Sequence, residues 1–325
     1  MNDILKFSIA GNGFDTACAP RLALGIGVFD GVHLGHRRII GELVRLAKRN
    51  GAVPAAMTFD PHPRAVLHPT EAPTLLVPLS ERIRLLREAG AELVLVVRFT
   101  VEFAQLEPEE FLRRLLECPE FRLAGICVGE RWRFGRGGCG DSALLREYAR
   151  SRGLDFTACP ELEIGGETVS SSVIRRAIAA GRLDTAAEML GRPYRLTGVV
   201  EYGYGAATSR LSCPTANLDF KAGVLPPDGV YAGCAVRDGR LYPAAVNVGL
   251  CPTFGWEKAR RRVEIHLLDY TGNLYGSELG VEFLHHLREE RTFTGPEELK
   301  LQIDRDLVRI REFFAQRQAQ EGKQA

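Results

Sequence analysis

The sequence has no long uninterrupted apolar run: nowhere do eighteen apolar residues follow one another. A membrane-spanning helix needs about that many, so none is expected. The N-terminal stretch MNDILKFSIAGNGFD also lacks a basic segment followed by an apolar one, which argues against a secretory signal peptide. We therefore expect no membrane partner and a cytoplasmic location.

An excess of charge of either sign is missing as well. With 42 Lys and Arg against 41 Asp and Glu, the formal net charge is +1. A balanced charge offers no general attraction to nucleic acid or anionic lipid, so any anion site must be local. The 8 cysteines include no C-x-x-C pair and no Cys/His set with zinc-ligand spacing, which favours reduced thiols in a cytosolic protein.

Short apolar runs alternate with helical patterns in the first part of the chain. Helical spacing covers Arg38–Asn50, Glu81–Ala89 and Pro108–Leu116. Strands that alternate with helices pair in parallel and carry helices on both faces. The predicted fold is α/β, a doubly wound (Rossmann-like) nucleotidyltransferase domain. Its predicted buried strands are Leu22–Val28, Val53–Phe59, Glu92–Phe99 and Leu123–Val128.

After Leu190 the pattern changes to short segments rich in Val, Tyr and Ile, separated by Gly, Pro and Asp turns. This pattern is typical of a β-barrel. An amphipathic helix is expected from Thr294 onward, with residues 317–325 frayed. The predicted domains are residues 1–187 and residues 188–325. The expected barrel strands are Pro193–Tyr202, Gly229–Val236, Leu241–Val248, Arg261–Asp269 and Gly280–Leu284.

The segment from Gly25 to His36, G-I-G-V-F-D-G-V-H-L-G-H, carries the strongest chemical signal. It places a glycine turn directly after the first predicted strand, and a helix is expected to begin near Gly35. Unpaired N–H groups and the dipole at a helix N-terminus attract anions. His33 and His36 can lie on one side of that turn. These residues favour a polyphosphate site that stabilises an in-line displacement.

The glycine spacing of this segment differs from that of two common nucleotide-binding motifs. Gly25-x-Gly27-x-x-x-Gly31 does not match G-x-G-x-x-G, which disfavours a dinucleotide-dependent oxidoreductase, and no Walker A pattern is present. With 7 His and 34 Gly, H-x-G-H arises by chance in roughly one or two chains per hundred. Two ordinary, partly buried histidines therefore remain an alternative, and the position after the strand favours function.

A second candidate element is Ser170-Ser171-Ser172-Val173-Ile174-Arg175, before a helix predicted over Ile174–Ala180. Serines cap helices routinely. The functional alternative is that the three hydroxyls and Arg175 hold a polyphosphate from the side opposite the histidines.

Together, G-x-F-D-G-V-H-x-G-H and the later S-S-S-x-x-R resemble the adenylyltransferase module of bacterial bifunctional riboflavin kinase/FMN adenylyltransferases, also called FAD synthetases. Three further stretches agree: Thr58–Arg64 (TFDPHPR), Phe103–Phe111 and Val128–Gly135. The similarity extends from about Leu22 to Phe314.

The resemblance implies that the phosphate of FMN attacks the α-phosphorus of MgATP, giving FAD and pyrophosphate. It implies catalytic roles for His33, His36 and Arg175. It also implies that nucleotide or flavin is bound by Gly27, Phe29, Asp30, Gly31, Gly35, Ser170, Ser171 and Ser172. The chain departs from the family pattern at Arg131 and Trp132, where an acidic or amide residue and Phe are usual, and at Val173, often Arg.

The second half resembles riboflavin kinases. Pro214-Thr215-Ala216-Asn217 matches their P-T-A-N motif, and the stretches around Asn247, Glu264 and Tyr275 agree. The resemblance implies transfer of the γ-phosphate of ATP to riboflavin, which gives FMN. Glu264 would be the general base. Pro214, Thr215 and Asn217 would bind the nucleotide, and Thr215 and Asn217 would hold Mg²⁺.

One loop differs from the kinase pattern. The family reads G-R-x-L-G-F before P-T-A-N, whereas residues 208–213 read T-S-R-L-S-C. Glycines there would bring backbone N–H groups to the phosphates. Three functions therefore stay open: a bifunctional enzyme, a monofunctional FMN adenylyltransferase with a structural or flavin-sensing barrel, and a nucleotidyltransferase with another phosphorylated acceptor. The β-rich half argues against the third.

Overall fold

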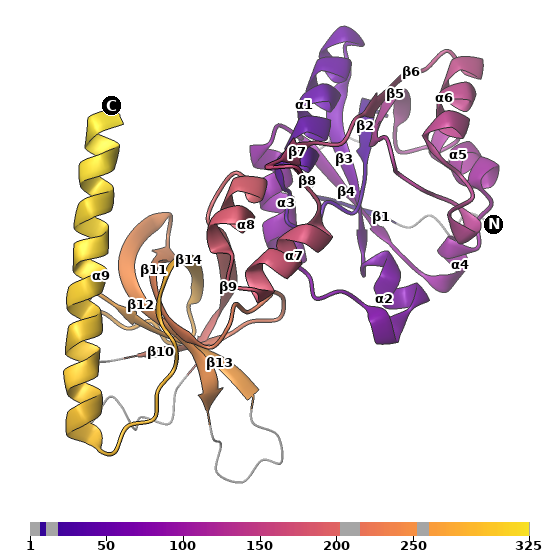
Figure 1. Ribbon diagram of the computed structural model, residues 1–325. Coiled ribbons are helices and arrows are strands. Elements are labelled where there is room, and N and C mark those ends of the chain that lie inside the picture. Colours follow the sequence, from indigo (N-terminus) through magenta and orange to yellow (C-terminus); the bar gives the residue numbers. More distant parts are fainter. Residues whose placement is uncertain (1–6, 11–18, 202–214, 252–259, 325) are drawn as a thin grey trace. The chain divides into compact units, whose positions relative to one another are not determined.

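The computed structural model describes residues 7–10, 19–201, 215–251 and 260–324. The chain forms two compact units (Figure 1). The N-terminal unit comprises residues 1–75 and 79–171, and the C-terminal unit comprises residues 76–78 and 172–325. The predicted division at residues 187 and 188 stays a prediction. Pro214, the altered loop at 208–213 and the motif residues 252–254 lie outside the described residues.

A six-stranded sheet forms the centre of the N-terminal unit, in the order β1-β4-β3-β2-β5-β6 (Figure 1). Strands β2 to β6 are parallel to one another, and β1 pairs antiparallel with β4. The four predicted strands are confirmed, whereas β1 and β6 were not predicted. The strands are β1 (Phe7–Ala10), β2 (Arg21–Ile26), β3 (Val53–Asp60), β4 (Leu93–Arg98), β5 (Arg122–Gly129) and β6 (Asp155–Cys159).

Helices cover both faces of this sheet. On one face, Leu24 packs in a core cluster with Phe111 and Leu145, which come from α5 and α6. On the other face, Gly25 lies so close to α1 that an added Cβ would be 2.9 Å from Leu43. The doubly wound prediction is therefore confirmed. The helices are α1 (Leu34–Arg49), α2 (Pro63–Leu67), α3 (Leu79–Glu88), α4 (Val101–Ala104), α5 (Pro108–Leu116) and α6 (Ser142–Ser151), and a small hairpin joins β7 (Glu163–Ile164) to β8 (Glu167–Thr168).

The C-terminal unit is built on a closed antiparallel barrel in the order β10-β13-β12-β11-β14-β9. Two helices precede it, α7 (Ser171–Ala179) and α8 (Leu183–Leu190), and α8 contacts β9 and β14. Five barrel strands match the prediction, and the short β10 was not predicted. The strands are β9 (Tyr194–Glu201), β10 (Ala216–Asp219), β11 (Gly229–Arg237), β12 (Arg240–Cys251), β13 (Arg260–Leu267) and β14 (Glu278–Arg288).

The last helix, α9 (Pro296–Gln324), packs along the barrel through its apolar face (Figure 1). Ile310 is fully buried against Val230, Leu268 and Leu287. At its start, the backbone N–H and hydroxyl of Thr294 both donate to Glu298. The expected fraying is wrong for residues 317–324, which continue the helix.

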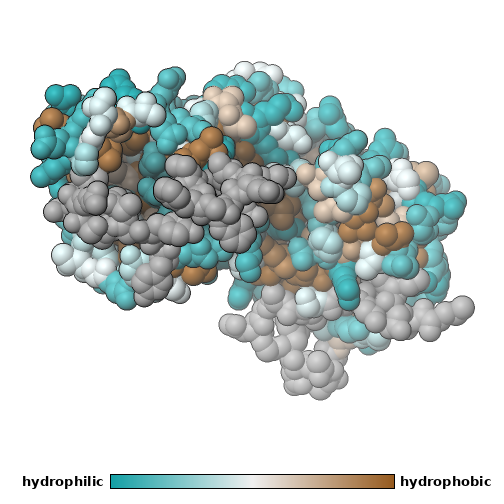
Figure 2. All heavy atoms as spheres, turned by 90° about the horizontal axis from the view of Figure 1, so that it is seen from below, coloured by the Kyte–Doolittle hydropathy of each residue, from teal (hydrophilic) through white to brown (hydrophobic). Residues whose placement is uncertain are grey.

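Among the described residues, none of the helices is both long and apolar enough to cross a membrane. On the face drawn in Figure 2, hydrophilic residues cover much of the described surface, and hydrophobic residues gather in patches between them.

Candidate active sites

The turn between β2 and α1 is held in an unusual backbone conformation. Phe29, Gly31 and Val32 have positive φ angles of 54°, 78° and 40°. For the two residues with side chains, this conformation costs about 1–2 kcal/mol each. Both side chains are completely buried, and their burial offsets the strain. Such backbone strain clusters at functional sites.

His33 and His36 contact each other at the start of α1. His33 is the N-cap residue: its Nδ1 accepts a hydrogen bond from the backbone N–H of His36 at 3.3 Å. The two rings stack with their centroids 3.6 Å apart and an interplanar angle of 18°. The edge of Phe29 packs against the second ring at 5.2 Å. A Cβ at Gly35 would lie only 3.2 Å from the His33 ring, so this glycine permits the close approach.

The electrostatic surroundings keep His36 neutral. Burial lowers its pKa well below the ordinary value, and the charges of His33 and Arg82 lower it further. Its Nδ1 is buried and has no hydrogen-bond partner among the described residues. A buried ring nitrogen without a hydrogen-bond partner among the described residues, at the N-terminus of a helix, suits an anionic ligand.

The serine segment lies against the same turn. The hydroxyl of Ser171 donates to the backbone carbonyl of Asp30 at 2.9 Å. Phe29 and Asp30 are buried, so their side chains shape the turn from within. Ser172 and Arg175 belong to the C-terminal unit, and their predicted place on the phosphates stays a prediction.

An aromatic cavity of about 890 Å³ lies in the N-terminal unit and includes Val28, which directly precedes the turn. Trp132 and Phe134 stack on its wall with centroids 4.7 Å apart and an angle of 12°. A concave site with aromatic walls and a few charged groups suits a planar aromatic ligand that carries a phosphate. The lining includes Phe59, His62, Arg64, Phe99, Phe103, Phe111, Trp132, Arg133 and Phe134.

Arg82 is a candidate site residue that the sequence motifs did not predict. It lies on α3 and is completely buried. Its guanidinium donates hydrogen bonds to Val28, two residues after β2, and to Phe59 near the end of β3. The signal that could have found it is its helical spacing: Arg82 shares the buried face of α3 with Leu85 and Leu86.

In the barrel, the pairing of β13 with β10 and β12 places three polar residues side by side on neighbouring strands. Glu264 on β13 is directly opposite Asn217 on β10 and Asn247 on β12, so the three side chains share a face. Glu264, Asn247 and Thr215 line a cavity of about 290 Å³. Burial raises the pKa of Glu264, the charge of Arg262 lowers it, and the charge of Glu290 raises it further.

The oxygen ligands here fit Mg²⁺. The Oδ1 atom of Asn217 is buried without a hydrogen-bond partner among the described residues, which leaves it able to bind a cation. The described part of the chain shows no group of three or more His, Cys, Asp or Glu side chains that could hold a metal. Mg²⁺ commonly binds through one or two protein ligands together with substrate phosphates, which suits Thr215 and Asn217.

A buried ion pair closes the other wall of this cavity and was not predicted. Arg288 at the end of β14 pairs with Asp306 of α9 at 2.8 Å. Gln302 donates to the second oxygen of Asp306, also at 2.8 Å. The sequence signal was a carboxylate within the apolar stripe of the last helix, beside Leu307 and Ile310.

Comparisons with known proteins match both units. The FAD synthetase family matches residues 15–173, and the riboflavin kinase family matches residues 190–314. The bifunctional riboflavin kinase/FMN adenylyltransferase of Escherichia coli (strain K12) is 36% identical over 292 residues, covering 90% of this chain and 92% of the relative. That of Bacillus subtilis (strain 168) is 32% identical over 296 residues, with the same coverage of 90% and 92%.

The crystal structure of a macrolide-efflux protein from Streptococcus pneumoniae has a TM-score of 0.79 and 26% identity, and covers 91% of this chain and 96% of that one. The resemblance seen in the sequence motifs is confirmed by the sequence relatives. The chain belongs to the bifunctional riboflavin kinase/FMN adenylyltransferase family, and it is a transferase that combines an FMN adenylyltransferase module with a riboflavin kinase module.

Proposed function

We propose that the N-terminal unit transfers the adenylyl group of MgATP to FMN, and that the C-terminal unit phosphorylates riboflavin with MgATP. The chain would thus convert riboflavin to FMN and FMN to FAD. The observation that supports this most is the stacked pair of His33 and His36 at the start of α1. Val28, which directly precedes the turn before this pair, also lines the aromatic cavity.

In adenylyl transfer, a phosphate oxygen of FMN attacks the α-phosphorus of ATP. The bond from that phosphorus to the bridging oxygen of the β-phosphate breaks, and pyrophosphate leaves. The imidazoles of His33 and His36 and the first N–H groups of α1 donate to the phosphate oxygens, where negative charge accumulates. The flavin ring occupies the aromatic cavity beside Trp132, with Arg64 and Arg133 among its charged lining residues.

The remaining predicted residues complete this site. Gly27, Gly31 and Gly35 allow the backbone to approach the nucleotide. Ser170, Ser171 and Ser172 with Arg175 hold the polyphosphate from the other side. Mg²⁺ that arrives with ATP would neutralise part of the phosphate charge.

In the barrel, Glu264 takes the proton of the riboflavin 5′-hydroxyl. The hydroxyl oxygen attacks the γ-phosphorus of ATP, and ADP leaves. A raised pKa makes the Glu264 carboxylate a stronger base. Thr215 and Asn217 would hold Mg²⁺, which would neutralise phosphate charge when bound. We expect both reactions in the cytoplasm.

Product analysis tests both halves. Purified protein with MgATP receives riboflavin or FMN, and the flavins are separated chromatographically. FAD from both substrates supports the bifunctional enzyme. FAD from FMN alone supports the alternative in which the barrel is structural or senses flavin, whereas no FAD from FMN overturns the proposal. As matched variants, Glu264→Gln should abolish only FMN formation, and His36→Asn should abolish only FAD formation.

A further inference from the structure

Arg82 links the end of β3 to the segment that follows β2, from inside the protein. Its side chain has no exposed surface. Its Nη1 donates to the carbonyl of Val28 at 3.2 Å, the hydroxyl of Thr58 at 3.1 Å and the carbonyl of Phe59 at 3.0 Å. The hydroxyl of Thr58 itself donates to Val28 at 2.8 Å. One guanidinium nitrogen thus connects Phe59, near the end of β3, to Val28, the residue directly before the turn that leads to His33.

The rest of this guanidinium lacks partners. Its Nε and Nη2 are buried and have no hydrogen-bond partner among the described residues, and the three acceptors of Nη1 are neutral. Burial lowers its pKa, and the charges of Asp30 and Asp60 oppose that shift without reversing it. An arginine stays protonated even when buried, and a buried charge that is not directly paired is costly.

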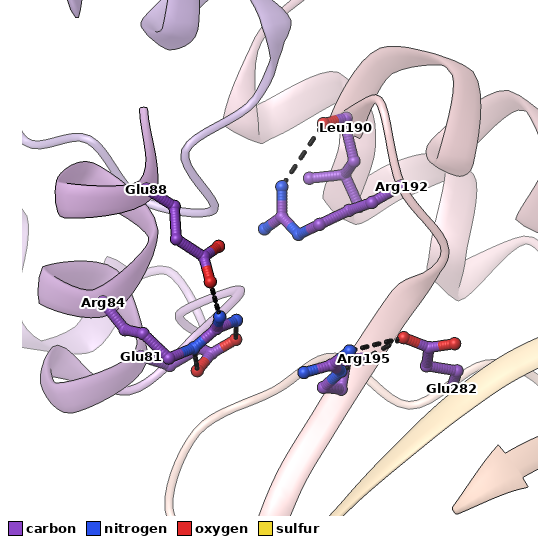
Figure 3. A network of polar contacts seen from close by, with 7 residues as sticks. All are labelled: Glu81, Arg84, Glu88, Leu190, Arg192, Arg195 and Glu282. Atoms are coloured by element: carbon purple, nitrogen blue, oxygen red, sulfur yellow. Dashed lines mark hydrogen bonds and ion pairs between the residues drawn. The ribbon is translucent and has the colours of Figure 1, made fainter. Parts of the chain in front are cut away.

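Arg84, two residues along the same helix, contrasts with it. Figure 3 shows the exposed guanidinium of Arg84 paired with Glu81 and Glu88. Packing of α3 against the strands could be served by an apolar side chain at position 82, as it is at Leu85 and Leu86. Packing alone therefore gives no reason for an arginine here, and its three hydrogen bonds use only one of its nitrogens.

The charge of Arg82 acts at the candidate active site. Val28 directly precedes the turn whose left-handed residues place His33 and His36. The guanidinium contributes to the lowered pKa of His36, so its field extends to the imidazole pair. The same field is favourable for an anion at the start of α1.

We propose that Arg82 is a positioning residue for adenylyl transfer: it fixes the turn that presents the histidine pair, and its buried charge stabilises the phosphate charge that gathers there. This inference rests on the proposed adenylyltransferase function. Arg82 would contact neither substrate, because its unpaired nitrogens are sealed from the surface. Its effect should therefore fall on the rate of transfer more than on the binding of FMN.

The test compares Arg82→Met, which removes charge and donors, with Arg82→Lys, which keeps the charge. We expect Arg82→Met to lower kcat for FAD formation about 100-fold, with KM for FMN changed less than about threefold. Arg82→Lys should lose only about three- to tenfold. Riboflavin kinase activity in the same preparation should be unchanged. Arg84→Met is the matched control, because it removes the same charge from the same helix and should leave both activities intact.

Wild-type kcat in Arg82→Met would overturn the inference, and so would an Arg82→Lys variant as inactive as Arg82→Met. If Arg82→Met does not fold, the Arg82→Lys variant alone tests the proposal. A wild-type kcat for FAD formation in that variant would then overturn it. Failure of the proposed function would look different, because the wild-type protein itself would then make no FAD from FMN.

Discussion

His33 caps the helix whose first turn carries His36, through its own ring nitrogen and the backbone N–H of its partner 3.3 Å away. The same imidazole therefore holds the second histidine in place and stacks upon it. Under the proposed function, the side chain that caps the helix is also one that binds the phosphates.

Substitution of His33 can separate these two contributions. Asn is a good N-cap residue and Ala is not, so His33→Ala should lose about 1 kcal/mol of unfolding free energy that His33→Asn retains. Both variants should lose about 100-fold in FAD formation, because neither has an imidazole. Urea unfolding and FAD assays on the pair measure the difference. Wild-type FAD formation by His33→Asn would show that the ring is needed only as a cap.

The buried, neutral state of His36 predicts a loss of stability in acid. Its pKa in the folded protein lies well below the ordinary value, so from about pH 6.5 down to that lowered pKa the unfolded chain takes up this proton and the folded protein does not. Folding stability is then lost as the pH falls. Relative to His36→Asn, the wild type should lose about 1 kcal/mol between pH 6.5 and 5.5. Urea unfolding followed by Trp132 fluorescence in a Trp256→Phe background measures it, and a difference independent of pH would contradict it.

The two carboxylates of the kinase cavity predict a shift in its pH dependence. The negative charge of Glu290 adds to burial in raising the pKa of Glu264. Glu290→Gln removes that charge, so the pKa of Glu264 should fall and the acid limb of kcat/KM for FMN formation should move to lower pH. FMN formation followed from about pH 5 to 8 measures the shift, with Glu289→Gln as a control one residue away. A limb that stays in place would show that Glu264 is not the titrating base.

The stacked pair of Trp132 and Phe134 predicts an optical signal for flavin binding. A flavin ring beside Trp132 should quench its fluorescence by stacking or energy transfer, so FMN should quench a Trp256→Phe variant in a saturable way. A Trp132→Phe variant, which retains only Trp256, should lose that response. Free tryptophan with the same FMN corrects for absorbed light. Equal saturable quenching in both variants would argue against the aromatic cavity as the FMN site.

Periodicity predicted most of the fold, and the exceptions have physical reasons. β2 to β5 are buried on both faces, so their sequences are nearly continuous in apolar residues. β6 is an edge strand with only Cys159 fully buried, and its apolar content is too low to mark it. β10 has four residues with every second one buried, which is too short a pattern to recognise. It nevertheless carries Asn217.

Some residues of the candidate sites could be predicted from the sequence and others could not. His33 and His36 could be predicted because both lie in one short motif, Gly25–His36, in which the sequence also indicates where the helix begins. Arg82 could not, because its acceptor Val28 is 54 residues away along the chain, and an arginine on a helix is usually solvated. Asp306 was missed for a similar reason: its partner Arg288 is on another element.

The packing of α8 on β9 and β14 bears on how the chain can be divided for separate expression. Leu183, Ala186, Met189 and Leu190 are all buried, so a kinase fragment that begins at Tyr194 would leave that side of the barrel uncovered. A closed barrel has no unpaired edge strand. The apolar surface newly exposed in such a fragment would therefore be the part of the barrel that α8 covers. A fragment that starts before α8 keeps this cover and is the one to express.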